Sequence, residues 1–148
     1  MAEQTPVSWQ DFKDVATRRL KEARHLVELK NHRYYDGAVT YALLSAECAL
    51  KALILLDHGA NNQNELPSNI RLKAFHSKQG HRLKELSGAL SSNYQSQFQR
   101  EEVLALNKLD QKDPYDYRYG AKRPHKEAAA PAIDMAQKVL DCMKRLFP

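Results

Sequence analysis

AVTYALLSAECALKALILL, residues 38–56, is the stretch that decides the fold of this chain. Nearly every position is apolar, which is typical of a helix that is buried on all sides. The length would also suit a membrane span, but Glu47 and Lys51 stand at its centre, and charged side chains are costly in lipid. We therefore predict the central helix of a soluble, cytoplasmic protein that makes no membrane contact.

The residues around this stretch predict the bounds of the central helix and of its N-terminal neighbour. Asp36 can cap a helix over residues 37–58, and Gly59 stands just past its end. A first helix begins near Ser8, where Asp11 approximates a capping box, and it ends at residues 30–31. Steps of three or four residues place its apolar side chains on one stripe: Trp9, Phe12, Ala16, Leu20, Ala23 and Val27.

The C-terminal helix is predicted over residues 124–146, with Pro131 expected to break or kink it. Its inward stripe comprises Ala129, Ile133, Ala136, Leu140, Met143 and Phe147. Between the central and last helices we expect a polar connection over 61–79 and two helices, 81–90 and 96–109. Leu83, Leu86 and Leu90 point inward in the first of these two. The pattern predicts one all-α domain over residues 1–148, an up-and-down bundle of four to five helices with its core at about 8–147.

Composition excludes several other classes of protein. The chain has 148 residues, which fits a single domain, and 5 Gly and 6 Pro are too few for the tight turns of an all-β fold. Neither Gly-rich phosphate loop is present, and Cys48 and Cys142 lack metal-ligand spacing. We therefore expect no cofactor and no metal. The N-terminal MAEQTPVSWQDF has no basic region followed by an apolar one, so we expect no signal peptide.

Two charged clusters are candidates for function. Glu47 and Lys51 are one helical turn apart and can form an ion pair between neighbouring helices; alternatively, Glu47 faces a polar pocket and orients a catalytic side chain. Residues 71–84 contain no acid and several basic side chains. This stretch is either a solvated basic loop or a contact for a phosphate backbone. Its basic side chains are Arg71, Lys73, Lys78, Arg82 and Lys84, with His76 and His81.

A third cluster leads into the last helix, in YDYRYGAKRPHK, residues 115–126. His125 stands at the predicted helix N-terminus, where the helix dipole favours anions and lowers the pKa of an imidazole. Arg118 precedes it by seven positions. Lys122, Arg123 and Lys126 add charge that could hold phosphate, and tyrosines such as Tyr119 could stack on bases. The alternative is a polar connecting loop.

Three segments in this order resemble the HEPN domain, a small helical bundle. They are YDGAVTYALLSAECALKALI (35–54), GHRLKEL (80–86) and YRY (117–119), ahead of an Ala-rich last helix. The resemblance implies a metal-independent endoribonuclease of a toxin–antitoxin or phage-defence system, with an Arg-x(4–6)-His motif that Arg118 and His125 match. It also allows a second role, because an Arg-Tyr pair like Arg118-Tyr119 occurs in non-nuclease members. These members bind nucleotides or serve as partners of small nucleotidyltransferases.

We therefore expect RNA or a nucleotide as ligand. In the nuclease hypothesis, the ribose 2′-OH attacks the phosphodiester, His125 transfers a proton, Arg118 stabilises the transition-state charge and Glu47 orients one of them. The basic side chains named above would bind the phosphates. The resemblance further implies a symmetric homodimer whose motifs face each other, with an antitoxin or a nucleotidyltransferase as a possible protein partner.

Overall fold

The computed structural model describes residues 7–75, 82–112 and 126–148. Over these residues the chain forms seven α-helices and two 3₁₀ turns, with no β-strand. The all-α class is confirmed, and the described helices outnumber the four or five expected. The α-helices are α1 (Trp9–Glu28), α2 (Tyr35–Asp57), α3 (Ser68–Phe75), α4 (Leu83–Gly88), α5 (Ser92–Ser96), α6 (Arg100–Asp110) and α8 (Lys126–Leu146). The 3₁₀ turns are η1 (His32–Tyr34) and η2 (Gln63–Glu65).

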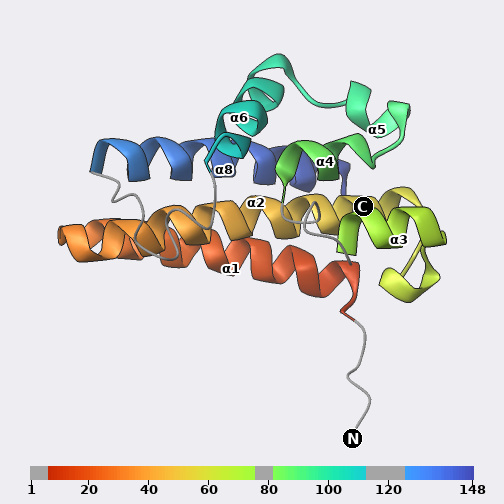
Figure 1. The fold of residues 1–148 in the computed structure, drawn as a ribbon, viewed down its shortest axis with the longest axis horizontal. Coiled ribbons are helices and arrows are strands. Elements are labelled where there is room, and N and C mark those ends of the chain that lie inside the picture. Colours follow the sequence, from red (N-terminus) through yellow and green to blue (C-terminus); the bar gives the residue numbers. More distant parts are fainter. Residues whose placement is uncertain (1–6, 76–81, 113–125) are drawn as a thin grey trace, which may run out of the picture.

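The three long helices form the body of the molecule. α2 packs along both α1 and α8, and α1 also contacts α8. Figure 1 shows that α1 runs antiparallel to α2, whereas α8 runs in the same direction as α2. The short helices α4, α5 and α6 form a second layer beyond α8, in which α6 packs on α8 and α4 contacts both α2 and α6 (Figure 1).

The capping box predicted at the start of α1 is confirmed. The Asp11 backbone N–H donates to Ser8 Oγ over 3.1 Å, and the Ser8 N–H donates to Asp11 Oδ2 over 3.3 Å. This start is tied to the other end of the chain, because the Trp9 and Phe147 rings stack with centroids 5.1 Å apart. Ser45 Oγ donates to the Ala16 carbonyl over 2.6 Å and fixes α1 against α2.

α2 is the core helix, as predicted, and most of its length is buried. By length and composition it is the one described helix that could cross a membrane, yet 72% of its most apolar window is covered by the rest of the protein. That burial is the arrangement of a core helix in a soluble bundle. The helix ends at Asp57, and Gly59, two residues later, has a φ of +63°, which suits glycine. The Gly59 N–H bonds the Leu56 carbonyl and the Ala60 N–H bonds the Leu55 carbonyl, which is a Schellman motif.

The predicted cap of α2 is wrong. The N-cap is Tyr34, which makes no side-chain cap bond, and the helix already begins at Tyr35. The physical reason is that η1 runs directly into α2, so Asp36 falls inside the first turn rather than ahead of it. Its Oδ1 atom is buried without a hydrogen bond in the described structure.

Three other local predictions need correction. The polar connection over 61–79 contains α3, and the helix predicted over 96–109 begins four residues later, at Arg100, as α6, because Ser96 is the last residue of the separate short helix α5. Gln99 is the N-cap of α6, and its backbone N–H donates to the Glu102 carboxylate. α8 does not break at Pro131; the proline removes one N–H near the helix start, so a single backbone bond is lost. The inward positions of Leu83, Leu86 and Leu90 are confirmed, since all three are buried.

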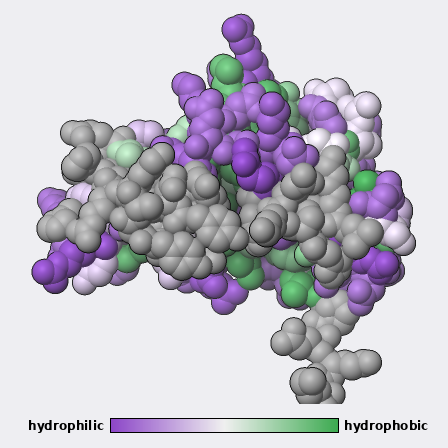
Figure 2. Space-filling model, in the orientation of Figure 1, coloured by the Kyte–Doolittle hydropathy of each residue, from purple (hydrophilic) through white to green (hydrophobic). Residues whose placement is uncertain are grey.

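Figure 2 shows one face of the molecule in space-filling form. The described atoms on this face are mostly hydrophilic, and hydrophobic atoms reach the surface only in small, separate areas. The exposed large hydrophobic side chains of the described residues are Val7, Leu29, Tyr34, Val103 and Leu104. Val103 and Leu104 are consecutive residues of α6, so their side chains point to different faces of that helix.

Candidate functional site

Most of the residues predicted to act on RNA lie outside the described residues. These are Arg118, Tyr119, Lys122, Arg123, His125 and Lys78. Lys73 lies in α3 and Lys126 is the first residue of α8, but their side chains are not described. Glu47, Arg71 and Arg82 are the predicted site residues whose side chains the structure describes.

The end of the bundle where α8 begins is also the end where α2 begins, because the two helices lie side by side in the same direction (Figure 1). The connection from α1 to α2 lies at this end and carries the exposed cations Lys30 and Arg33. Helix N-termini carry partial positive charge. The starts of α2 and α8 and these two cations contribute positive charge at this end of the bundle, whereas the C-terminus of α1 and the Asp36 carboxylate in the first turn of α2 oppose it.

A groove of about 220 Å³ lies between the C-terminal half of α1 and the first half of α8. It is lined by Arg24, Val27, Glu28, Ala130, Ile133 and Asp134. Arg24 Nη2 donates to Gln137 Oε1 over 2.7 Å, which ties the two helices together beside the groove. The two carboxylates in its lining oppose an anionic ligand, so we do not assign the groove to phosphate.

Glu47 and Lys51 form the predicted ion pair, and the pair is buried. Lys51 Nζ lies 3.5 Å from Glu47 Oε2, and each residue is 9% exposed. Lys51 Nζ also lies 5.4 Å from the centre of the Phe75 ring in α3, a cation–π contact. Burial, with the Glu47 charge, raises the pKa of the neighbouring Cys48 thiol to about 11, so this cysteine is a poor nucleophile at neutral pH. At 1.5 Å per residue, Glu47 stands about 18 Å along α2 from Tyr35.

The described part of the basic 71–84 stretch divides between two helices. Arg71 is half-buried in α3, whereas the Arg82 side chain, just before α4, is 61% exposed. Arg82 Nη2 lies 3.7 Å from Asp110 Oδ2 at the end of α6, and the Lys84 backbone N–H donates to Asp110 Oδ1 over 3.1 Å. Asp110 therefore caps α4 and joins it to α6.

Sequence reasoning missed the strongest ion pair in the described structure. Arg145 of α8 grips the Glu102 carboxylate of α6 with two hydrogen bonds of 2.6 and 2.7 Å and donates a third to the Gln97 carbonyl over 3.3 Å. Glu102 also accepts from the Gln99 backbone N–H over 2.7 Å. Burial acts to raise the pKa of Glu102, but these hydrogen bonds from Arg145 and Gln99 hold it below its ordinary value. Burial and Glu102 raise the pKa of the adjacent Cys142 thiol to about 12.

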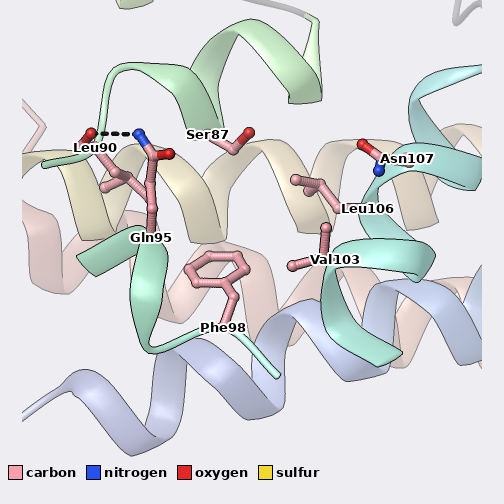
Figure 3. Close-up of a pocket in the computed structure, with 7 residues that line it drawn as sticks. All are labelled: Ser87, Leu90, Gln95, Phe98, Val103, Leu106 and Asn107. Carbon is pink, nitrogen blue, oxygen red and sulfur yellow. Dashed lines mark hydrogen bonds between the residues drawn. The ribbon is translucent and has the colours of Figure 1, made fainter. Parts of the chain in front are cut away.

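A pocket of about 120 Å³ opens where α4, α5 and α6 meet (Figure 3). It is lined by Ser87, Leu90, Gln95, Phe98, Val103, Leu106 and Asn107. Gln95 Nε2 donates to the Leu90 carbonyl over 2.7 Å, which joins α5 to the residues that follow α4 (Figure 3). None of these residues belongs to the sites predicted from the sequence.

Within residues 7–75, 82–112 and 126–148, no group of three or more His, Cys, Asp or Glu side chains could hold a metal ion. No protein-family model, curated protein or solved structure gives a significant match to this chain. The resemblance to HEPN domains therefore rests on the sequence features quoted above.

Proposed function

We propose that this chain is a HEPN-like protein that acts on RNA in the cytoplasm, and that Arg118 and His125 perform metal-independent endonucleolytic cleavage. One observation carries the proposal: α8 begins directly after His125 in sequence and lies parallel to α2, so two helix starts share one end of the bundle (Figure 1). The partial positive charge at the N-terminus of α8 favours a phosphate group there. The all-helical fold supports the same proposal.

The chemistry follows from the two side chains. His125 serves as general acid or base, since an imidazole can exchange a proton near neutral pH. Arg118 stabilises the extra negative charge that develops when the ribose 2′-OH attacks phosphorus. Lys122, Arg123 and Lys126 hold the flanking phosphates, and Tyr119 stacks on a base. Arg71, Lys73, Lys78 and Arg82 form a second contact for the strand, because α3, which carries Arg71 and Lys73, lies at the other end of α2 (Figure 1).

Glu47 is a positioning residue in this proposal. It lies about 18 Å along α2 from Tyr35 and pairs with Lys51 at 3.5 Å. This role therefore requires Arg118 or His125 to reach the middle of α2. Glu47→Gln should then lower kcat with little change in KM, because a group that orients the catalytic side chains acts on the chemical step. A merely structural role would instead lower stability and leave kcat per folded molecule unchanged.

The test is cleavage of a 5′-labelled single-stranded RNA by the purified chain in excess EDTA. His125→Ala should lower the rate by about 10²–10⁴-fold, the contribution of a general acid or base. Arg118→Ala should weaken binding as well as turnover, because a phosphate-holding charge acts in both the ground and transition states. His58→Ala is the matched control, since His58 is an exposed histidine at the far end of α2.

Two results would overturn the catalytic assignment. EDTA-resistant cleavage that survives His125→Ala would exclude this histidine as the proton-transfer group. Absence of cleavage, together with salt-dependent nucleotide or partner binding that Arg71 and Arg82 variants weaken, would favour the non-catalytic alternative, a module that partners a small nucleotidyltransferase.

We further propose that the protein works as a symmetric homodimer in which two Arg118–His125 segments meet. Twofold symmetry brings the same patch of both copies together, so a composite site needs only one surface. Sedimentation equilibrium should give a dimer at micromolar concentration. A monomer under these conditions, with full activity, would contradict this assembly. An antitoxin would be a partner of this dimer in the toxin–antitoxin setting.

A further inference from the structure

The connection between α1 and α2, residues 29–34, presents an aromatic ring and two cations to solvent. Tyr34 is 43% exposed, and Lys30 and Arg33 are exposed as well. Within the part of the chain that the structure describes, no hydrogen bond, ion pair or ring contact involves any of these three side chains. The connection itself contains no acid. Its ring and its cations are therefore available to a ligand.

Lys30 occupies a backbone position that suits glycine. It follows Leu29, the C-cap of α1, and has a φ of +54°. Glycine is the usual residue at such a helix end, because any side chain is strained there. The Lys30 N–H bonds the Val27 carbonyl over 3.1 Å, a backbone bond that glycine would make equally well. The turn therefore gains nothing from the lysine side chain.

Tyr34 also departs from the residue that its position favours. It is the N-cap of α2, where the side chain of Ser, Thr, Asp or Asn would bond a free backbone N–H. Tyr34 makes no such side-chain bond. Residues that break a local rule without a gain for the fold are expected at functional sites. Two such residues, Lys30 and Tyr34, lie in this one short connection.

The turn holds these side chains in place before any ligand arrives. The Arg33 backbone N–H donates to Asn31 Oδ1 over 3.0 Å, and the Tyr34 N–H donates to the Asn31 carbonyl over 3.0 Å. The next residue, Tyr35, is buried and anchors the turn to the bundle. A surface that is already ordered loses less free energy when it binds.

We propose that Lys30, Arg33 and Tyr34 form an additional contact for single-stranded RNA, in which one base stacks on the Tyr34 ring and the two cations bind neighbouring phosphates. The connection lies at the end of the bundle where α8 begins (Figure 1). RNA bound there is therefore close to the start of the helix that follows His125 in sequence. This inference rests on the proposed action on RNA and adds residues that lie outside the predicted motif.

The chemistry of these three side chains favours a nucleic-acid strand over a protein segment. An exposed ring beside cations is the combination that holds single strands, because the ring stacks on a base and the cations bind the backbone. Tyr34 lines neither the α1–α8 groove nor the pocket of the outer layer, so it offers a ring surface and not a hole for an apolar side chain.

Two acids flank the connection in sequence. Glu28 lines the groove between α1 and α8, and Asp36 has a buried Oδ1 atom. Both reduce the positive potential at this end of the bundle. The exposed ring beside two unpaired cations therefore carries the inference, and the net charge does not.

The experiment measures the binding of a fluorescein-labelled RNA strand of about 12 nucleotides to the purified full chain by fluorescence polarisation. The strand carries 2′-O-methyl groups, which block attack by the 2′-OH, so binding is measured separately from cleavage. Tyr34→Ala should weaken binding by about fivefold or more, the contribution of one stacked base. The matched variant Tyr34→Phe keeps the ring and should stay within about twofold of the native affinity.

Further variants test the cations and do not depend on the first pair folding. Arg33→Ala should weaken binding and lower its salt dependence by about one phosphate contact. Arg100→Ala is the matched control, because Arg100 is an exposed arginine of α6 in the outer layer. Lys30→Gly should weaken binding without loss of stability, a combination that a purely structural role does not produce. Circular dichroism and thermal unfolding confirm that each variant is folded.

Two results would refute this contact and leave the proposed function in place. One is RNA binding and cleavage by the native chain that Tyr34→Ala and Arg33→Ala leave unchanged. The other is an equal loss of affinity in Tyr34→Ala and Tyr34→Phe, which would exclude stacking on the ring. If Tyr34→Ala instead dissociates a dimer in sedimentation and keeps the RNA affinity, the surface belongs to a protein interface.

The same measurements separate this inference from the catalytic assignment. Binding of the 2′-O-methyl strand that depends on Tyr34, without cleavage of unmodified RNA, would support the contact and refute catalysis. A native chain that binds no RNA would refute both.

Discussion

The Glu102–Arg145 pair predicts an asymmetry between two substitutions that remove the same contact. The Glu102 side chain is 5% exposed, whereas the Arg145 side chain is 40% exposed. Arg145→Gln leaves a buried carboxylate without its counter-charge, and breaking a buried pair in this way costs about 3–5 kcal/mol. Glu102→Gln leaves the half-exposed guanidinium free to turn into water, and Gln can still accept from the Gln99 N–H. Its expected cost is about 1–2 kcal/mol.

The free energies of unfolding of the native protein and of Arg145→Gln should also depend differently on pH. The pKa of Glu102 is lowered in the folded chain, so its stabilising contribution is complete above the ordinary carboxyl pKa. That contribution is lost as the pH falls through the lower, folded value. In Arg145→Gln the Glu102 carboxylate is buried without a cation to pair with it. Protonation of Glu102 therefore removes the cost of burying an unpaired charge. The stability gap between native protein and variant should therefore narrow as the pH falls from about 7 to about 4.

Urea unfolding followed by Trp9 fluorescence measures both effects. Trp9 is the only tryptophan and stacks on Phe147 at the end of α8, so its emission reports the packing of the two chain ends. Circular dichroism provides a second probe of the same transition. Equal costs for the two variants at neutral pH, or a gap that widens on acidification, would refute this account of the pair.

Three smaller predictions concern stability and are checked by the same urea unfolding. Lys30 has a φ of +54°, a conformation that strains a residue with a side chain. Lys30→Gly should therefore stabilise the fold by up to about 1 kcal/mol and raise the thermal midpoint by roughly 3 °C. A loss of stability would show that the backbone at Lys30 is not strained. Ser45→Ala removes the buried 2.6 Å bond to the Ala16 carbonyl and should cost about 1 kcal/mol; no change would mean that this bond contributes nothing net. Asp57→Ala deprives Ser91 of two bonds and should cost about 1–2 kcal/mol, whereas a neutral result would contradict its role in fixing α5.

α1 and the end of α2 were predictable because each carries a local signal. Both halves of the α1 capping box, Ser8 and Asp11, stand at its start, and Gly59, with its positive φ, follows the end of α2. The start of α2 has no such signal, since its N-cap Tyr34 makes no side-chain cap bond. α3 has no comparable signal. It is eight residues long, and a helix that short depends on tertiary contacts. In the structure Phe75 supplies such contacts, to Phe12 and to Lys51.

The candidate sites also differ in whether a local sequence pattern could reveal them. The Glu47–Lys51 pair is one helical turn long, so its spacing was sufficient to predict it. Glu102 and Arg145 are 43 residues apart, so no local spacing pairs them. The one local signal is that Glu102 shares the helix face of Leu106 and Leu109, whereas Glu101 does not. The pocket depends on how three short helices meet, so its lining also has no local pattern. The resemblance to HEPN domains includes residues 80–86 at the start of α4, but the function it implies falls on residues 118–125, and it does not predict the pocket.

The chain has a net charge of +5, and its acidic and basic side chains have different structural roles. Five carboxylates accept backbone N–H groups at helix or turn starts: Asp11, Asp57, Glu65, Glu102 and Asp110. Acids in these positions are committed to the fold, because removing one leaves a backbone donor unsatisfied. The side chains of Lys84 and Arg100 are instead exposed. Replacing such an acid should therefore lower the urea midpoint, whereas replacing Lys84 or Arg100 should leave the midpoint nearly unaltered. A surface lysine or arginine whose replacement lowers the midpoint as strongly as that of Arg145 is shown by the same measurement to be a structural cation.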